Sequence, residues 1–417
     1  MKNNRVRAAI KKQVDTVKHP DSVGILPIVL RELRILFSHF YLILLVLAAP
    51  LIYPFIYGTV YINKMEHDIP VIIVDQDNSE ASRNLARDLD AHELIAVTEV
   101  CHDLQIARQR LNSLKTSAVI VIPSGFEMDL KKKRQTRISI SVSNLRFMVS
   151  GDINRAIGDV LSARAKNVTI AALETAGFSE EQSLAQAEPI RPIVVNCFND
   201  TESYGDFIIV GLLIIILQQT LLMGMSVSMA LERESNSLKS LFSLATNSIG
   251  EIIAGKALFY FVLYAAHALL YFTLYAWIYH IPISGSISAA VSLMLLHIAS
   301  IILWSLLISS FFKTRLMALC IFVFTSYPLF LLSGFSWPLS LLPRYLFYFS
   351  QCLPSTPFIN AFCTITQKNG SWADVLPQFI HMLILLFLGF SALWIRLTYM
   401  KHSFGSSESV NANPLLR

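Results

Sequence analysis

The pattern of apolar and polar positions divides the chain into long apolar runs and one large polar insertion. A helix needs roughly 20 mostly apolar residues to cross about 30 Å of hydrocarbon. Six runs are long enough, and the only Asp, Glu, Lys or Arg in any of them is Arg396, near the end of the last run. We therefore predict six transmembrane helices, at 40–62, 207–230, 257–279, 287–310, 316–334 and 378–399.

The first of these runs contains two prolines, Pro50 and Pro54, which lack the backbone N–H that a helix uses. A membrane helix tolerates proline where neighbouring helices satisfy the carbonyl groups left free. Lone histidines lie inside three later runs, at His267, His297 and His381. Such a histidine can relay protons, but we expect hydrogen bonds between helices instead.

The polar insertion, residues 63–204, alternates short apolar runs with helical patterns. Short apolar runs bounded by turn residues are typical of buried strands, and strands that alternate with helices form an α/β sheet. We expect an α/β domain with helices at 79–91, 102–114 and 150–175 and strands at 68–77, 94–100, 117–123, 137–143 and 192–198.

A cluster of polar residues follows the first of these strands and consists of Asp75, Asp77, Asn78 and Ser79. One interpretation is a metal or nucleophile site. The other is that these residues end the strand and cap the next helix, with Ser79 as the N-cap. We favour capping, and we expect no catalytic, cofactor or metal site in this chain.

The composition supports a membrane protein. Of the 417 residues, 54% are hydrophobic and 15% are charged, whereas soluble domains carry about 25% charged residues. These values exclude a disordered chain, a nucleic-acid-binding tail and an ordinary cytosolic enzyme, so no nucleic acid is expected as a partner.

The Lys and Arg residues set the expected orientation, because cytoplasmic loops of membrane proteins are enriched in them. With both termini in the cytoplasm, segments 1–39, 231–256, 311–315 and 396–417 hold 16 Lys and Arg against 7 Asp and Glu. The remainder holds 18 against 22. We therefore predict a multi-pass membrane protein whose α/β insertion is extracytoplasmic.

Two segments on the expected cytoplasmic side have helical patterns of their own. In 24–40, an apolar stripe opposite Arg31 and Glu32 predicts a helix lying in the membrane interface. The members of this stripe are Leu26, Leu30, Leu33 and Phe37. The second segment, 231–256, is amphipathic, and its apolar face can contact a cytoplasmic partner or lie against lipid headgroups.

The end of this second segment reads GEIIAGK (250–256) and has the glycine spacing of a phosphate-binding loop. It lacks the Ser or Thr that would bind Mg²⁺, and no apolar strand precedes it. We therefore do not expect the chain to bind or hydrolyse ATP itself.

The same segment reads ERESNSL (232–238) and IIAGK (252–256). It is similar to the E-R-E-x-G-T-L…I-x-x-G-K signature of ABC-2-type transporter permeases, although Asn236 and Ser237 stand where the family commonly has Gly and Thr. Residues 70–89, 118–130 and 329–362 resemble further stretches of the same family.

The resemblance implies a half-transporter of the bacterial inner membrane. Two permease chains, identical or closely related, would pair around a translocation path, each with a separate ATPase subunit that binds ATP and Mg²⁺. The subfamily with a large external domain includes exporters of drugs and small molecules, which work with periplasmic adaptor proteins. Segment 335–377 would form short external helices.

The resemblance also implies which residues meet the ATPase, namely those in the interfacial helix and in the segment after the second span. The residues expected to couple the chain to the ATPase are Arg31, Arg34, Glu232, Arg233, Glu234, Leu238 and Leu241.

Polar residues inside the second span form the best candidate for the translocation path: Gln218, Gln219 and Thr220, with the adaptable Met223 below. Polar groups inside a span are costly unless they face a cavity or another helix. They therefore either line the path or lock helix packing.

One disulfide is compatible with the predicted topology. Cys352 and Cys363 lie in the external segment with Pro354 and Pro357 between them. A turn at these prolines would bring the two α-carbons towards the roughly 4.4–6.8 Å that a disulfide requires. The alternative is that the cysteines are free and fill space.

A membrane-anchored sensor with an external α/β domain is the alternative class of protein. A sensor needs a cytoplasmic output domain, and no predicted cytoplasmic segment is longer than 1–39. We therefore favour a permease.

Overall fold

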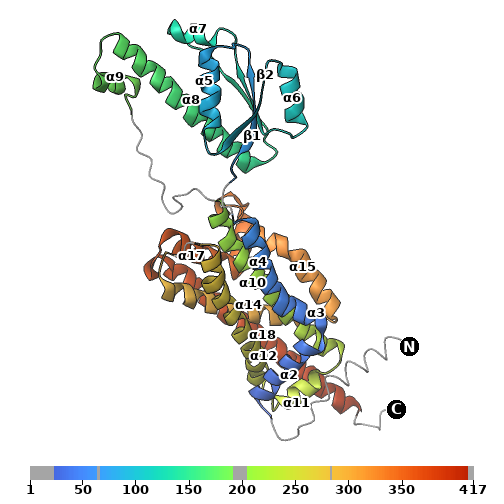
Figure 1. Cartoon of the computed structure of the whole chain (residues 1–417). Coiled ribbons are helices and arrows are strands. Elements are labelled where there is room, and N and C mark those ends of the chain that lie inside the picture. The colour runs from blue at the N-terminus through green and yellow to red at the C-terminus, as the bar shows by residue number, and fades with distance from the viewer. Residues whose placement is uncertain (1–22, 63–65, 191–203, 282–283, 412–417) are drawn as a thin grey trace. The chain divides into compact units, whose positions relative to one another are not determined.

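A computed structural model describes residues 23–62, 66–190, 204–281 and 284–411 (Figure 1). The chain divides into two compact units, and each is described here by itself. The membrane unit comprises Met1–Lys64 and Asn196–Arg417, and the inserted unit comprises Met65–Val195.

Among the described residues, the membrane unit contains six helices long and apolar enough to span a membrane, as the sequence predicts. They run over Phe40–Val60, Gly205–Glu234, Ile249–Ile278, Ile287–Ser309, Arg315–Leu332 and Trp372–His402. Their elements are α3 (Phe40–Ile43), the π-helical turn η1 (Leu44–Ala48), α4 (Ala49–Val60), α10 (Tyr204–Glu234), α12 (Ile249–Leu270), the π-helical turn η2 (Tyr271–Tyr275), α13 (Ala276–Ile278), α14 (Ile287–Ser309), α15 (Arg315–Leu332) and α18 (Trp372–Asn411).

The second and fourth spans, α10 and α14, are the most buried of the six. The third span begins at Ile249, earlier than the predicted 257. Sequence hydropathy places its start after Lys256 because lysine is charged, but this lysine is fully buried inside the unit. Helix α12 instead begins where the Ser248 side chain accepts a hydrogen bond from the Glu251 N–H.

Shorter helices complete the membrane unit. They are α2 (Ile25–Ser38), α11 (Leu238–Leu244), the 3₁₀ turn η3 (Leu339–Leu341), α16 (Arg344–Gln351) and α17 (Ser355–Lys368). The last three lie in the segment predicted to form short helices between the fifth and sixth spans.

The prolines of the first span are compensated by side chains from the third span. Pro50 cannot donate to the Val46 carbonyl, and the His267 ring nitrogen contacts that oxygen at 3.2 Å. Pro54 likewise frees the Pro50 carbonyl, which accepts from the Tyr271 hydroxyl at 2.5 Å. Tyr275 and Tyr279 continue the series by donating to the carbonyls of Leu51 and Phe55. The first and third spans are therefore joined by a ladder of hydrogen bonds, as the sequence predicts for these prolines.

The inserted unit is an α/β domain built on a four-stranded sheet in the order β2-β1-β3-β4. Strand β1 (Ile69–Asp75) is parallel to β2 (Ile95–Cys101) and β3 (Ala118–Ile122), and β4 (Ser139–Val142) is the antiparallel edge strand. The predicted strands up to residue 143 are confirmed. The predicted strand at 192–198 lies outside the described residues.

Helices cover both faces of this sheet (Figure 1). Helices α5 (Glu80–Asp90), α7 (Phe126–Lys131) and α8 (Phe147–Thr175) contribute to the larger apolar cluster on one face. Helix α6 (Leu104–Asn112) contributes Ala107 to a smaller cluster on the other face. The three predicted helices are confirmed, and α9 (Glu180–Ala187) is an additional one.

The polar cluster after β1 caps local structure, as favoured above. The Ser79 hydroxyl accepts from the Ser82 N–H at the start of α5. The Asp75 carboxylate accepts from the Ser82 hydroxyl, and the Asp77 carboxylate accepts from three backbone N–H groups at the start of α7, at 2.6–3.1 Å. Among the described residues, no group of three His, Cys, Asp or Glu side chains is arranged to hold a metal.

These hydrogen bonds make Asp77 sensitive to pH. Burial raises the pKa of its carboxyl group, but hydrogen bonds from Ser79 and from the backbone of residues 125–127 outweigh burial and lower the pKa. A lowered folded-state pKa means that the carboxylate stabilises the fold above the ordinary Asp pKa. That contribution is lost as the pH falls through the lowered value.

Asp77→Ala should therefore loosen the start of α7 by about 1 kcal/mol, the usual cost of losing a helix cap. Hydrogen exchange of the α7 amides in the full chain measures this effect near neutral pH, and the difference from wild type should vanish in strong acid. Asp159→Ala, which removes an exposed carboxylate from α8, is the control. Equal α7 protection in both variants would contradict the capping role.

Candidate functional site: a buried charge cluster

Helix α2 presents its charged residues to the protein and its apolar stripe to the surroundings. Arg31 is 2% exposed and Glu32 is fully buried, whereas Leu26 and Phe37 are 68% and 61% exposed. The helix ends before His39, whose extended backbone separates α2 from the first span. The exposed stripe is suited to lipid, as expected for an interfacial helix. The inward face carries Arg31 and Glu32 beside the buried apolar residues Ile28, Ile35 and Leu36.

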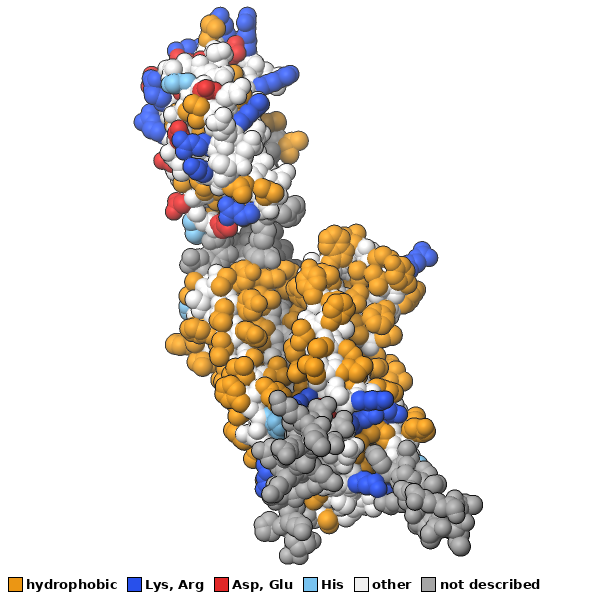
Figure 2. Space-filling view, turned by 90° about the vertical axis from the view of Figure 1, so that its right-hand side faces the viewer, with side chains coloured by type: hydrophobic (Ala, Val, Ile, Leu, Met, Phe, Trp, Pro, Cys, Tyr) orange, Lys and Arg blue, Asp and Glu red, His pale blue; other side chains and the backbone are white. Residues whose placement is uncertain are grey.

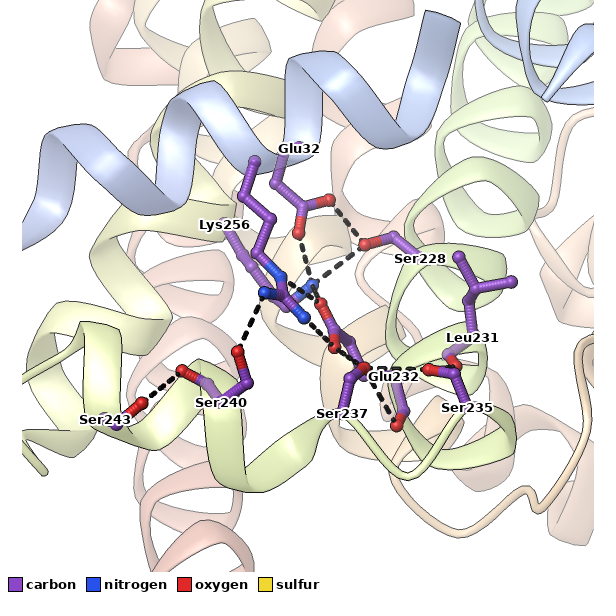
Figure 3. Close-up of polar contacts among 10 residues, drawn as sticks. Glu32, Ser228, Leu231, Glu232, Ser235, Ser237, Ser240, Ser243 and Lys256 are labelled. Atoms are coloured by element: carbon purple, nitrogen blue, oxygen red, sulfur yellow. Dashed lines mark hydrogen bonds and ion pairs between the residues drawn. The ribbon is translucent and has the colours of Figure 1, made fainter. Parts of the chain in front are cut away.

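Two buried ion pairs hold α2 in place. The Arg31 guanidinium binds the Glu232 carboxylate of α10 through two hydrogen bonds, of 2.9 and 2.8 Å. One residue further along α2, Glu32 pairs with Lys256 of α12. Glu232 and Lys256 are both fully buried, and the Lys256 ammonium is also 3.9 Å from the Glu232 carboxylate. Glu32, Glu232 and Lys256 converge from three helices in Figure 3.

Serine hydroxyls satisfy the remaining polar atoms of this cluster (Figure 3). Ser228 accepts from Lys256 at 2.9 Å and donates to Glu32. Ser237 donates to Glu232, and the Arg31 guanidinium also donates to Ser240 of α11 at 3.3 Å. The four charged side chains, two cations and two carboxylates, sum to zero. We call these four residues together with the three serines the buried charge cluster.

A glycine makes the Glu32–Lys256 pair geometrically accessible. A Cβ on Gly255 would lie 2.6 Å from Ile28 Cβ and 3.2 Å from the Ile25 carbonyl oxygen, both on α2. Only glycine therefore lets α2 approach α12 this closely. The Gly255-Lys256 pair, rejected above as a phosphate-binding loop, lies inside helix α12 and serves close packing and charge pairing.

The other residues of the ERESNSL stretch also have defined partners. Glu234 accepts from the backbone N–H of Arg315 at 3.0 Å, and the Arg315 side chain donates to the Tyr41 hydroxyl. The Arg233 guanidinium donates to the Ser310 carbonyl. The second span is thereby tied to the fourth and fifth spans at this end of the unit, and the fifth span is tied to the first.

The two departures from the family signature have defined roles in this structure. Asn236 has a φ of +56°, in the left-handed region that glycine favours and asparagine tolerates. Ser237 supplies the hydroxyl that donates to Glu232, which a threonine would also carry. The buried charge cluster therefore has a hydroxyl donor to Glu232 at this position.

The apolar face of α11 packs into the chain itself, which corrects the two alternatives given above. Leu238 is 5% exposed, and Leu241 and Ala245 are fully buried in the core of the membrane unit. Neither a partner nor lipid headgroups cover this face. Exposed polar residues, including Lys239 and Ser243, form the outward side of α11, and Arg34 is exposed on α2.

Of the candidate path residues of α10, Gln219 forms a hydrogen bond to a neighbouring helix of the same chain. Gln218, Gln219 and Thr220 are buried, and Met223 is half-buried. The Gln219 side-chain amide donates to the Phe322 carbonyl of α15, and the Thr220 hydroxyl donates within its own helix. An apolar pocket of about 390 Å³ opens elsewhere, among α2, α12, α14 and α18, and none of these four residues lines it.

The possible Cys352–Cys363 disulfide is not formed, because both cysteines are free thiols, which is the alternative given above. The chain does turn between α16 and α17, but Pro357 and Cys363 lie inside α17. That helix carries Cys363 about 12 Å along its axis from Ser355, at about 1.5 Å per residue. Cys363 packs against the core, and burial raises the pKa of its thiol to about 12.

The lone histidines behave differently from one another. His267 and His381 contact backbone carbonyl oxygens of other elements, as expected. His297 is buried and stacks on Phe358 with ring centroids 3.9 Å apart, and neither of its ring nitrogens has a hydrogen-bond partner in the structure. The expectation of a hydrogen bond therefore fails for this histidine.

Sequence reasoning missed Lys256 as a site residue and placed Glu32 only on the polar side of its helix. The sequence does contain a signal: Glu32 and Lys256 have opposite charges and each lies next to an apolar run. Because neither charge can be buried alone without a large cost, a buried pair between them could have been inferred. Six helices long and apolar enough to span a membrane, with an inserted α/β domain and a neutral buried charge cluster at one end, define a multi-pass membrane protein.

The family is established by comparison with known proteins. The family described as ABC-2 family transporter protein matches residues 40–396, and the chain belongs to this family. It is therefore a permease subunit of an ABC transporter. Permeases of this kind lack an ATPase domain, so membership implies a partner ATPase subunit that hydrolyses ATP.

Individual relatives are distant but cover most of the chain. The linearmycin resistance permease protein LnrN of Bacillus subtilis is 23% identical over 83% of this chain and 91% of its own length. The probable multidrug ABC transporter permease YbhR of Escherichia coli is 23% identical over 74% of this chain and 82% of its own length.

Proposed function

We propose that this permease exports a small drug-like or amphipathic molecule from the cytoplasm or the inner membrane, driven by its partner ATPase. Two relatives support the substrate class, since one is named for linearmycin resistance and the other as a probable multidrug permease. The termini and the buried charge cluster would face the cytoplasm, in agreement with the distribution of Lys and Arg.

The observation that carries the proposal is the buried charge cluster. It joins α2 to α10 and α12 through two buried ion pairs, and to α11 through the hydrogen bond from Arg31 to Ser240. Because an unpaired buried charge is costly, α2 would not separate easily from the spans. A push on α2 and α11 by the ATPase would then move these spans as one body.

The predicted coupling residues take different parts in this mechanism. Arg31 and Glu232 would transmit the motion from within, and Leu238 and Leu241 would hold α11 against the spans. Exposed Arg34 and half-buried Glu234 would lie closest to the ATPase, and Arg233 would brace the end of α14. Gln218 to Met223 would line the path or lock packing once two chains pair.

The full assembly in this proposal contains two permease chains, identical or related, and two ATPase subunits. A periplasmic adaptor that contacts the inserted α/β domain belongs to the same proposal. The mass of the complex purified in mild detergent tests the stoichiometry, and an active monomer without any ATPase subunit would contradict it.

Glu232→Ala combined with Glu234→Ala should lower ATP-driven transport at least tenfold while the chain still inserts. The measurement is ATP-dependent accumulation of an amphipathic fluorescent dye in inside-out proteoliposomes that contain the permease and its ATPase. Glu251→Ala removes a carboxylate from the same end of the unit outside the cluster and serves as the control. Transport by the double variant at the wild-type rate would refute the coupling role, and wild-type vesicles that move no amphipathic dye would refute the exporter assignment.

A further inference from the structure

Two arginines from different spans converge on one carbonyl oxygen at the end of α14. Arg233 of α10 donates to the Ser310 carbonyl. Arg396 of α18 donates to the same oxygen at 3.3 Å and contacts the Ser310 hydroxyl at 3.4 Å. In the part of the chain that the structure describes, neither guanidinium forms an ion pair with a carboxylate.

This arrangement leaves uncompensated positive charge. Like charges repel, and the repulsion grows where water is partly excluded, as it is around these half-buried side chains. The C-terminal end of a helix offers only about half a negative elementary charge. The two carboxylates that flank Arg233 along the chain are already bound, Glu232 to Arg31 and Glu234 to Arg315. An anion bound by the two arginines would compensate this charge.

The arginines also retain donors that can bind such an anion. A guanidinium carries five N–H donors, of which Arg233 uses those on one nitrogen and Arg396 those on two. Both side chains are half-buried, and none of their guanidinium nitrogens that lacks a partner is enclosed by the protein. The remaining donors are therefore accessible. Guanidinium groups bind phosphate oxygens in a two-pronged geometry that lysine does not provide.

The surroundings of the pair are apolar and exposed. The Arg396 guanidinium lies 4.4 Å from the centre of the Phe311 ring and 5.9 Å from that of Tyr399. Phe311, Tyr399 and the neighbouring Ile395 are 57%, 68% and 69% exposed. Figure 2 shows Lys and Arg side chains near one end of an otherwise apolar surface of the membrane unit. An anion at this depth would be a lipid headgroup, with acyl chains against the exposed apolar residues.

We propose that Arg233 and Arg396 form a binding site for the phosphate of an anionic phospholipid at the end of α14. The two positive charges favour a headgroup with net negative charge, such as phosphatidylglycerol, over a zwitterionic one whose ammonium they would repel. A bound phosphate would bridge α10, α14 and α18. This site does not depend on which molecule the permease exports.

The test is native mass spectrometry of the delipidated full-length permease titrated separately with phosphatidylglycerol and phosphatidylcholine. Wild type should retain phosphatidylglycerol preferentially, and Arg233→Gln with Arg396→Gln should lower that retention about tenfold. Arg344→Gln, which removes an exposed arginine at the start of α16, is the matched control and should bind like wild type. Equal retention by the double variant and the control would overturn the proposal.

Two further measurements keep the proposal testable if the double variant does not fold. Arg396→Lys keeps the charge but loses the two-pronged geometry, so its phosphatidylglycerol retention should fall at least threefold, and unchanged retention would overturn the site. Millimolar inorganic phosphate should not displace the lipid from wild type, and complete displacement would indicate a free-anion site instead. A variant that loses the ATPase subunit but keeps phosphatidylglycerol would assign the pair to the protein partner and overturn the lipid assignment.

Discussion

Lys256→Met should destabilise the permease by roughly 3–5 kcal/mol, the usual effect of removing one partner from a buried ion pair. Among the described residues, the substitution leaves the fully buried Glu32 with Ser228 as its one remaining partner. It also removes a cation that lies 3.9 Å from Glu232. The expected results are a lower thermal unfolding temperature in detergent and faster hydrogen exchange throughout α2.

Lys313→Met is the matched control, because this lysine is exposed at the same end of the unit. Glu32→Gln combined with Lys256→Met should recover most of the lost stability, since neither charge is then left unpaired. If the ion pair also transmits the ATPase motion, the double variant will be stable but poorly coupled, with ATP hydrolysis that no longer drives transport. Equal unfolding temperatures for Lys256→Met and Lys313→Met would contradict the role assigned to this pair.

Gly255→Leu should dislodge α2 from α12 and abolish transport. Even the first carbon of a side chain at this position would lie 2.6 Å from Ile28, closer than atoms pack. Gly255→Ala should therefore cost about 1–3 kcal/mol, as overpacking usually does, and leucine should cost more. The measurement is hydrogen exchange of the α2 amides together with dye transport in proteoliposomes.

Gly250→Ala provides a control on the same helix with the opposite expected sign. A Cβ there meets Trp394 only at 3.7 Å, which is ordinary contact, and alanine is up to about 1 kcal/mol more favourable than glycine in a helix. Ile28→Ala combined with Gly255→Ala should restore part of the α2 docking by making room for the added methyl group. Protection of α2 in Gly255→Leu at the wild-type level would show that α2 does not depend on this close approach.

The α/β domain shows how far local pattern determines structure. Its strands are short runs that are apolar or alternate between apolar and polar residues, and its helices have helical patterns, with side-chain N-caps at α5 and α6. These local patterns alone predict β1 to β4 and α5, α6 and α8. The six spans follow from length and hydropathy in the same way. These features need only information that lies within about 20 neighbouring residues.

The buried charge cluster is different, because its four charged residues come from three separate segments of the sequence. Hydropathy treats Lys256 as the end of a loop, and helical periodicity places Arg31 and Glu32 on a polar face without saying what that face meets. Cysteine spacing likewise permits a Cys352–Cys363 bridge that helix α17 prevents. A contact between distant segments depends on how helices pack together, and no local sequence pattern predicts it.

The sequence by itself therefore determined the class of the protein, the number of spans, the inserted domain and the absence of a phosphate-binding loop. Only the tertiary structure decided that α2 turns its charges inward, that Gly255 lets it approach α12, and that Arg233 and Arg396 share one carbonyl oxygen. The physical reason is that burial of an apolar or capped segment is favourable wherever the segment packs. Burial of a charge is tolerated only where a side chain of opposite charge, from a distant segment, pairs with it.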